Sequence, residues 1–184
     1  SRGEGLGNKF LSHIREVDAI VHVVRCFDDE NITHVDGNVN PLRDMETINL
    51  ELIFADMESI DRRLPKAISM QKADKKYAID VERLEKMKAW LEDGKPLRTM
   101  AVDDDFKAFI DEQFLLTSKP VIYVANVDEN TIGGNDYTEA VTKGAAEEGA
   151  GCIVLCAKLE EDLVALDDDD RAIFMEEYGL TESG

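Results

Sequence analysis

The chain has 184 residues, of which 43% are hydrophobic and 33% are charged, and its formal net charge is −19. This composition is typical of a globular domain with a substantial core and excludes an intrinsically disordered chain. Because 40 acidic residues outnumber 21 basic ones, the surface as a whole repels phosphate backbones, and binding of DNA is not expected.

The sequence shows neither a targeting signal nor the cysteine spacing of a zinc site or a disulfide framework. No apolar run is long enough to cross a bilayer, and the polar, glycine-rich residues 1–5 do not form a signal peptide. Cys26, Cys152 and Cys156 lack CxxC spacing, which argues against a zinc site or a disulfide framework. They lie in apolar segments, so we expect buried thiols in a reducing cytoplasm.

The first third of the sequence predicts a helix and a strand. Residues 8–16 have the apolar spacing of a short helix, and residues 18–27 indicate a buried strand. The next segment, 28–43, is rich in Asp, Asn, Gly and Pro and predicts a loop.

Two long amphipathic helices are predicted next. The first is expected to begin with Asp44 as its N-cap and to stop at Pro65. The second is expected over residues 72–91, with Gly94 just beyond its end. Each has an apolar stripe at spacings of three and four residues, so we expect the pair to pack as an antiparallel hairpin.

The rest of the chain alternates helices with strands. The elements predicted here are a third helix over 103–116, a strand over 120–125, a helix over 137–148, a buried strand over 152–156 and an acidic helix over 160–178. In the first of these we expect inward-facing Phe106, Phe109, Ile110 and Phe114. Such alternation predicts an α/β fold with a parallel sheet and right-handed crossovers. Since three strands make a small parallel sheet, its faces and edges are expected to need further cover.

Polar residues follow the central strand directly. Asn126 and Glu129 come just after the apolar run that ends at Ala125. Ligands of open α/β sheets bind at this carboxyl end, and an amide with a carboxylate can read the edge of a nucleotide base. The simpler alternative is a strand followed by a polar turn.

Three segments, taken together, resemble one family. They are Gly3 to Leu11; Val23 to Phe27 with His34-Val35 and residues 44–49; and Asn126-Val127-Asp128-Glu129. The first two are similar to the second switch region and the following strand, loop and helix of the YchF / Obg-like ATPase family of P-loop nucleotidases. The last is similar to that family's altered base-recognition motif, and the resemblance spans essentially the whole chain.

The resemblance implies a fold and a domain organisation. The three strands would be part of a P-loop nucleotidase sheet with an inserted antiparallel helical hairpin. Residues 1–43 and 117–184 would be the second half of the nucleotide-binding domain, and residues 44–116 the helical, coiled-coil-like insertion. The sequence contains no GxxxxGK[ST] loop, and the family's TGS domain is not recognised in it, so the resemblance implies an internal fragment.

The resemblance also implies ATP as the ligand and a set of base-side residues. Asn126 would orient the base loop, Val127 would pack along the base and Glu129 would sit near the base edge. The segment Cys156-Ala157-Lys158 would close the other side through backbone N–H groups. GTP-directed relatives use NKxD, whose Asp accepts from guanine; Glu129 stands at that place here. Mg²⁺ and the catalytic groups would lie outside this chain, which alone is expected to be inactive.

The resemblance finally implies a ribosome or RNA partner for the complete, cytoplasmic protein, engaged in part through the hairpin. The sequence offers a cluster of basic residues there: Arg62, Arg63, Lys66, Lys72, Lys75 and Lys76. A solvated helix face explains this cluster equally simply. The alternative function is a non-catalytic interaction module, in which a helical hairpin on a small α/β base only binds partners. A phosphatase or receiver-like reading of the runs 103–105 and 167–170 is poor, since such runs are common at helix starts.

Overall fold

The computed structural model describes residues 7–28 and 38–180 and divides the chain into two compact units. Unit 1 comprises Ser1–Ile20 and Met45–Val121, and unit 2 comprises Val21–Asp44 and Ile122–Gly184. Within the described ranges, no helix is both long enough and apolar enough to cross a membrane.

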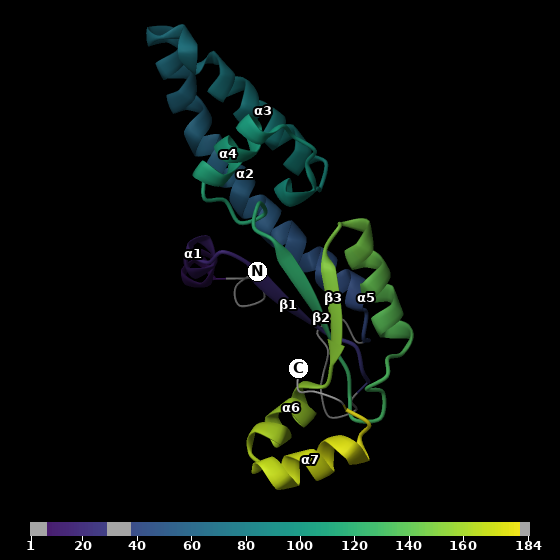
Figure 1. The fold of residues 1–184 in the computed structure, drawn as a ribbon. Helices are drawn as coiled ribbons and strands as arrows, with labels where there is room; N and C mark the ends of the chain where they lie inside the picture. Colours follow the sequence, from purple (N-terminus) through teal and green to yellow (C-terminus); the bar gives the residue numbers. More distant parts are fainter. Residues whose placement is uncertain (1–6, 29–37, 181–184) are drawn as a thin grey trace. The chain divides into compact units, whose positions relative to one another are not determined.

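The structure confirms an α/β chain in which helices and strands alternate (Figure 1). The elements are α1 (Asn8–Glu16), β1 (Ile20–Arg25), α2 (Pro41–Ala73), the 3-10 turn η1 (Lys75–Tyr77), α3 (Ala78–Glu92), the 3-10 turn η2 (Leu97–Thr99), α4 (Asp104–Glu112), β2 (Val121–Asn126), α5 (Asp136–Glu147), β3 (Gly151–Leu155), α6 (Ala157–Val164) and α7 (Asp168–Glu177).

The three strands form one parallel sheet in the order β1-β2-β3. Ile122 is paired with Gly151 and Asn126 with Leu155, so β2 and β3 run in the same direction. On the other side of β2, Ile20 N donates to Pro120 O (2.9 Å) and Cys26 N donates to Asn126 O (2.8 Å). The carboxyl ends of all three strands therefore meet at one edge, as the sequence predicts.

The outer strands are less buried than expected. Val23 of β1 is 57% exposed and Ile153 of β3 is 49% exposed, whereas most of β2 is buried. The prediction of buried strands over 18–27 and 152–156 is wrong in this respect, because apolar runs do not reveal that the outer strands of this sheet are only partly covered. Ile122 and Ile153 lie on the same face, since Ile153 is paired with Val124.

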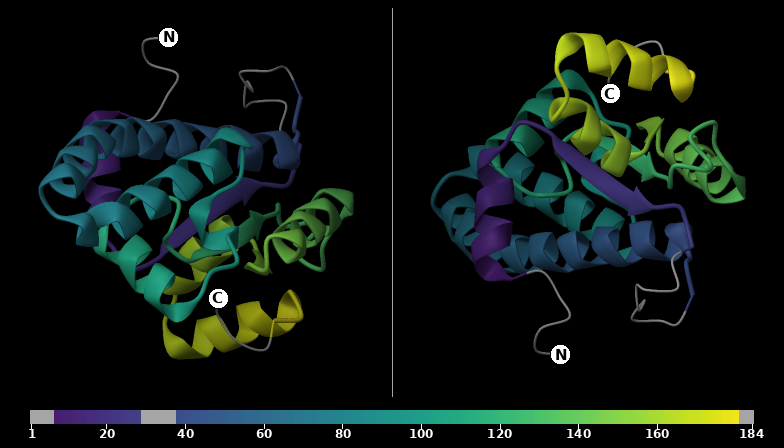
Figure 2. Two further views of the ribbon diagram at one scale, coloured as in Figure 1. Left: turned by 90° about the horizontal axis from the view of Figure 1, so that it is seen from above. Right: turned by 90° about the horizontal axis from the view of Figure 1, so that it is seen from below.

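Unit 1 is built on the predicted helical hairpin. α2 and α3 lie side by side in both views of Figure 2 and run in opposite directions. Their apolar stripes meet η2, α4 and Leu115 in one core, which consists of Ile53, Ile60, Leu84, Met87, Leu91, Leu97, Ile110 and Leu115. The burial of these side chains, rather than helix propensity, stabilises the pair.

The predicted ends of the first hairpin helix are both wrong. α2 begins at Pro41, and Asn40 caps it: Asn40 Oδ1 accepts from Arg43 N (3.1 Å). Asn at the N-cap followed by Pro is a favoured helix start, so Asp44 lies inside the first turn. At the other end α2 passes through Pro65 to Ala73. Proline removes one hydrogen bond, but Ala67 still packs against the core and the helix continues.

Three further boundaries differ from the predictions. α3 begins at Ala78 instead of residue 72, because Asp74 Oδ1 accepts from Lys76 N (3.0 Å) and starts the turn η1. The acidic helix predicted over 160–178 is two helices, because Asp167 caps a new one by accepting from Asp170 N (2.8 Å). Phe114, expected to face inward, lies beyond α4 and is 68% exposed.

A buried carboxylate joins the hairpin to the segment before β2. Asp56 of α2 is fully buried and accepts hydrogen bonds from Leu116 N (2.8 Å), Thr117 N (2.7 Å) and Thr117 Oγ1 (2.7 Å). Burial raises the pKa of Asp56, while these hydrogen bonds act in the opposite direction. The carboxylate thus fixes the start of β2 to the middle of α2.

We predict that Asp56→Ala lowers the free energy of unfolding by at least ~2 kcal/mol, a fall of roughly 4–8 °C in Tm, because the buried donors lose their acceptor. Thermal unfolding followed by circular dichroism measures this. Asp61→Ala is the matched control, since the Asp61 side chain is 52% exposed and pairs only with Lys88 among the described residues. Equal Tm changes for the two variants would contradict the assignment.

The cysteines differ in accessibility. Cys26 and Cys156 are buried, Cys152 is partly exposed, and all are free thiols. Burial, followed by the nearby Cys152 and Asp44, raises the pKa of Cys26 to about 12. We therefore predict that iodoacetamide at pH 8 modifies Cys152 in the native protein and spares Cys26 until the protein unfolds. Peptide mass spectrometry after a time course checks this, and native-state labelling of Cys26 as fast as that of Cys152 would refute it.

Candidate functional site

The candidate site lies in unit 2, where β2 and β3 end. Asn126 is the last residue of β2, and Cys156 follows β3 as the N-cap residue of α6. Asn126 Oδ1 accepts a hydrogen bond from Ala157 N (2.9 Å). Ala157 is the first residue of α6, so this bond joins the end of the central strand to the start of the helix that follows its neighbour.

The two residues next to this junction, Val127 and Cys156, have buried side chains. Val127 is 2% exposed and Cys156 is 4% exposed. The backbone of Val127 extends the sheet by one bond, because Val127 N donates to Leu155 O (3.0 Å). Val127 therefore has little side-chain surface to offer a ligand, and any contact it makes falls to its backbone.

Glu129 and Lys158 form an ion pair at the surface of the site. Lys158 Nζ lies 2.8 Å from Glu129 Oε1, and the side chains are 73% and 32% exposed, respectively. The hydrogen bond to Glu129 is the main cause of the raised pKa of Lys158. A carboxylate acceptor and an ammonium donor thus stand next to each other.

The loop that carries Glu129 is held by its own side chains. Asp128 Oδ1 accepts from Asn130 N (3.1 Å) and from Thr131 Oγ1 (2.8 Å), which forms an Asx turn. Asn135 then caps α5 and donates through Nδ2 to Cys26 O (2.7 Å), just beyond β1. The loop after β2 and the end of β1 are thereby fixed at the same edge.

These residues surround a cavity of about 370 Å³. Its lining consists of Phe27, Asp28, Asn126, Val127, Asp128, Glu129, Asn130, Cys156 and Lys158. The structure brings together five of the six residues singled out from the sequence; Ala157 lies behind the lining and is reached through Asn126. Sequence reasoning missed Phe27 and Asp28, although their position directly after the first strand was a usable signal.

This edge presents charged and aromatic side chains to a ligand. Among the described residues, no group of three or more His, Cys, Asp or Glu side chains is placed to hold a metal. The cavity instead offers the Glu129 and Asp28 carboxylates, the Lys158 ammonium group and the aromatic side chain of Phe27. Of the segments that carry the family resemblance, residues 1–6 and His34-Val35 lie outside the described residues.

Comparison with known proteins gives a consistent result. No protein-family model matches the chain. The chain is 47% identical over 188 residues to "Ribosome-binding ATPase YchF" of Bacillus subtilis (strain 168) and 44% identical over 185 residues to the protein of the same name from Escherichia coli O157:H7. Both alignments cover 100% of this chain and 51% of the relative. The chain also matches the solved structure of the Schizosaccharomyces pombe YchF GTPase with a TM-score of 0.87 and 33% identity, covering 98% of this chain and 50% of that one.

The chain belongs to the YchF family. It spans about half the length of the curated relatives it matches. The three-stranded parallel sheet and the α/β class are those of the YchF structure.

We predict that Asn126→Ala opens the start of α6 locally. Loss of the Oδ1 acceptor leaves Ala157 N without its partner, and protection of this amide from hydrogen exchange should fall about tenfold, in line with one net hydrogen bond. Exchange measured by NMR tests this. Asn130→Ala is the control, because Asn130 is exposed in the same loop and only its backbone N–H is bonded to Asp128. Unchanged protection of Ala157 in Asn126→Ala would show that the bond does not persist in solution.

Proposed function

We propose that this chain supplies the base-binding side of an ATP site in a P-loop nucleotidase that hydrolyses ATP and works at the ribosome. The observation that carries the proposal is the junction of Asn126 with Ala157 at the carboxyl edge of a parallel sheet, beside a cavity large enough for a base. The names of the bacterial YchF relatives, "Ribosome-binding ATPase", support the activity and the partner.

Each base-side residue has a proposed role. Asn126 orients the loop after β2 and holds the N-terminus of α6 against it. Glu129 accepts from the exocyclic amine of adenine, and Lys158 keeps the Glu129 carboxylate in place. Cys156 lines the opposite wall, Ala157 acts through its bond to Asn126, and Val127 contributes through its backbone.

The remaining chemistry is assigned to groups outside this chain. Hydrolysis of the β–γ phosphoanhydride needs Mg²⁺ and donors around the phosphates, and the sequence contains no GxxxxGK[ST] loop to provide them. In this proposal residues 1–43 and 117–184 are the second half of the nucleotide-binding domain, and residues 44–116 are the helical insertion. What this chain itself does is to bind and orient the base.

The partner proposal rests on a separate element. Lys66, Lys72, Lys75 and Lys76 are exposed near the tip of the hairpin, where α2 ends and α3 begins. Exposed lysines on an otherwise acidic chain suit an anionic partner such as ribosomal RNA. Cytoplasmic location follows from this proposed partner. The alternative of a purely non-catalytic module is less well supported, because the relatives that match the whole chain are named ATPases.

The test uses the complete protein that contains this chain, and calorimetry measures its affinity for ATP. Asn126→Ala is expected to weaken ATP binding at least tenfold, because the base loop and the start of α6 lose their common support. Asp61→Ala should bind ATP as the unchanged protein does, because Asp61 lies outside the cavity lining and pairs with Lys88. The isolated 184-residue chain should release no phosphate from ATP above the buffer rate.

Two results would contradict the proposal. One is unchanged ATP affinity in Asn126→Ala, which would show that the base does not bind at this edge of the sheet. The other is phosphate release by the isolated chain that Asn126→Ala abolishes, which would place the catalytic groups within these residues.

A further inference from the structure

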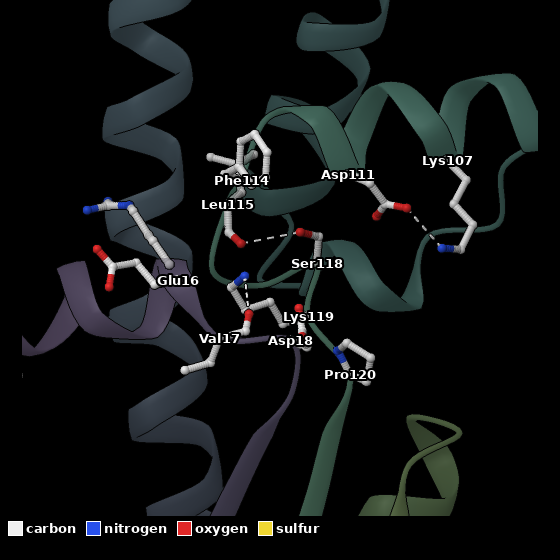
Figure 3. Close-up of a pocket in the computed structure, with 11 residues that line it drawn as sticks. Glu16, Val17, Asp18, Lys107, Asp111, Phe114, Leu115, Ser118, Lys119 and Pro120 are labelled. Carbon is white, nitrogen blue, oxygen red and sulfur yellow. Dashed lines mark hydrogen bonds and ion pairs between the residues drawn. The ribbon is translucent and has the colours of Figure 1, made fainter.

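A cavity of about 720 Å³ in unit 1 is lined by the end of α1 and by the segment from α4 to β2 (Figure 3). Its charged lining consists of three cations and three carboxylates: Arg15, Lys107, Lys119, Glu16, Asp18 and Asp111. Lys107 pairs with Asp111 (3.2 Å) and Lys119 Nζ donates to Val17 O (2.7 Å), as the dashed lines in Figure 3 show. This balanced lining selects no class of ligand. The cavity at the carboxyl edge of the sheet, in unit 2, differs in this respect.

The segment that follows β1 at the sheet edge is held by side-chain contacts at successive residues. Cys26 O accepts from Asn135 Nδ2 (2.7 Å). Phe27 O accepts from Arg25 Nε (3.0 Å), and the Arg25 guanidinium lies 5.1 Å from the centroid of the Phe27 ring. Because Phe27 and the next residue line the cavity, the chain itself fixes this part of the lining.

The next residue, Asp28, is held by a tyrosine of α5. The Tyr137 hydroxyl donates to the Asp28 carboxylate and lies 3.0 Å from Oδ1 and 3.2 Å from Oδ2. This hydrogen bond is the main cause of the raised pKa of Tyr137. The two residues are 109 positions apart in the sequence, so the contact joins the end of β1 to the start of α5 and does not belong to a local turn. Asp28 lines the cavity, whereas Tyr137 lies outside its described lining.

The start of α5 also holds the loop that follows β2. Thr131 Oγ1 donates to Asp128 Oδ1 (2.8 Å), and Asn135 Nδ2 lies 3.4 Å from Thr131 Oγ1. Asn135 is the N-cap residue of α5, and Tyr137 is the second residue of that helix. The segments after β1 and after β2, both of which line the cavity, are therefore held from one point in the fold. Such support outside the lining is what keeps binding residues in a fixed geometry.

The carboxylate of Asp28 determines the kind of group it can bind. A carboxylate only accepts hydrogen bonds and offers about four lone-pair sites, so one bond from Tyr137 leaves most of this capacity to a ligand. Asp28 and Glu129 both repel the phosphates of a nucleotide. The parts of a nucleotide that remain as partners are the neutral donors of the nucleoside, which are the exocyclic amine of the base and the hydroxyls of the ribose.

We propose that Asp28 is a further nucleoside-binding residue of this site, which accepts a hydrogen bond from the exocyclic amine of adenine or from a ribose hydroxyl, and that Tyr137 positions its carboxylate. The inference rests on the proposed function, because it requires a nucleotide in this cavity. Asp28 contacts the ligand, whereas Tyr137 acts through Asp28. A carboxylate that is already held loses little rotamer freedom on binding, so the contact contributes more to affinity.

The test measures the affinity of the complete protein for ATP and for tripolyphosphate by calorimetry. Asp28→Ala is expected to weaken ATP binding roughly three- to tenfold, as loss of one hydrogen bond to a charged group implies, and to leave the affinity for tripolyphosphate, which has no nucleoside, unchanged. Asp61→Ala is the control, because the Asp61 carboxylate is exposed, pairs with Lys88 and lies outside the cavity lining.

Three ATP analogues identify the donor that Asp28 binds. Purine riboside triphosphate lacks the exocyclic amine, and 2′-deoxy-ATP and 3′-deoxy-ATP each lack one ribose hydroxyl. The loss of affinity caused by Asp28→Ala should disappear with the analogue that lacks the donor and persist with the others.

Tyr137→Phe tests the positioning role, since it removes the hydroxyl and keeps the ring. It should weaken ATP binding about threefold in the otherwise unchanged protein and have no effect in the Asp28→Ala background, because Tyr137 acts through Asp28. Tyr178→Phe is the matched control. The Tyr178 ring packs on Phe174, with the centroids 4.8 Å apart, and lies outside the cavity lining, so this variant should bind ATP normally.

The outcomes separate this inference from the proposed function. Unchanged ATP affinity in Asp28→Ala, in a protein whose ATP binding is weakened by Asn126→Ala, would overturn the inference and leave the proposed function intact. So would an Asp28→Ala effect that persists with tripolyphosphate or with all three analogues, or a Tyr137→Phe effect that adds fully to that of Asp28→Ala. Unchanged affinity in both Asn126→Ala and Asp28→Ala would refute the proposed function and the inference together.

Discussion

The hydrogen bond from Ala157 N to Asn126 Oδ1 is the contact on which the geometry of the sheet edge depends. Parallel pairing brings the ends of β2 and β3 to one edge, but pairing alone does not fix the direction in which α6 leaves it. The Asn126 amide does so by accepting from the first residue of α6, at the end of the helix where N–H groups lack partners within the helix. Val127 and Cys156, both buried, then keep the two chain segments packed together beneath it.

In unit 1 a polar side chain also fixes a neighbouring segment by accepting from its backbone N–H groups, with a different outcome. There the carboxylate of Asp56 accepts from Leu116 and Thr117 and, with Arg63, fixes a loop to α2. At the sheet edge the fixed side chain creates a cavity with polar walls. In unit 1 the fixed loop holds the backbone of Phe114 in the left-handed region, which a bulky residue rarely adopts. In both places one polar side chain sets the path of a loop by accepting from backbone N–H groups. In unit 1 these N–H groups are buried, so leaving them unpaired would be costly.

Sequence reasoning succeeded where periodicity and strand order carry the information. The alternation of apolar segments predicts the parallel sheet, and the stripes of α2 and α3 predict the hairpin core around Ile60 and Leu84. It failed where tertiary contacts outweigh local rules. Pro65 does not end α2, since Ala67 beyond it still packs on the core. Phe114 faces solvent because distant residues of α2 set its backbone, and no window of sequence around it contains Asp56 or Arg63. The positions of Asn126 and Glu129 after the central strand could be predicted, but the use of Asn126 as an anchor for α6 could not.

The pair formed by Glu129 and Lys158 bears on which base the site would read. Guanine is recognised by a carboxylate that accepts from two adjacent N–H groups, so both carboxylate oxygens must be available to the base. One oxygen of Glu129 pairs with Lys158 at 2.8 Å, so in the proposed site the other oxygen would accept from the single exocyclic amine of adenine. Because Lys158 is 73% exposed, water screens the pair and it opens at small cost. A preference for adenine over guanine that depends on this exposed ion pair would be small. Stronger selection in this site would need a donor or acceptor that is fixed by burial, as Asp56 is in unit 1.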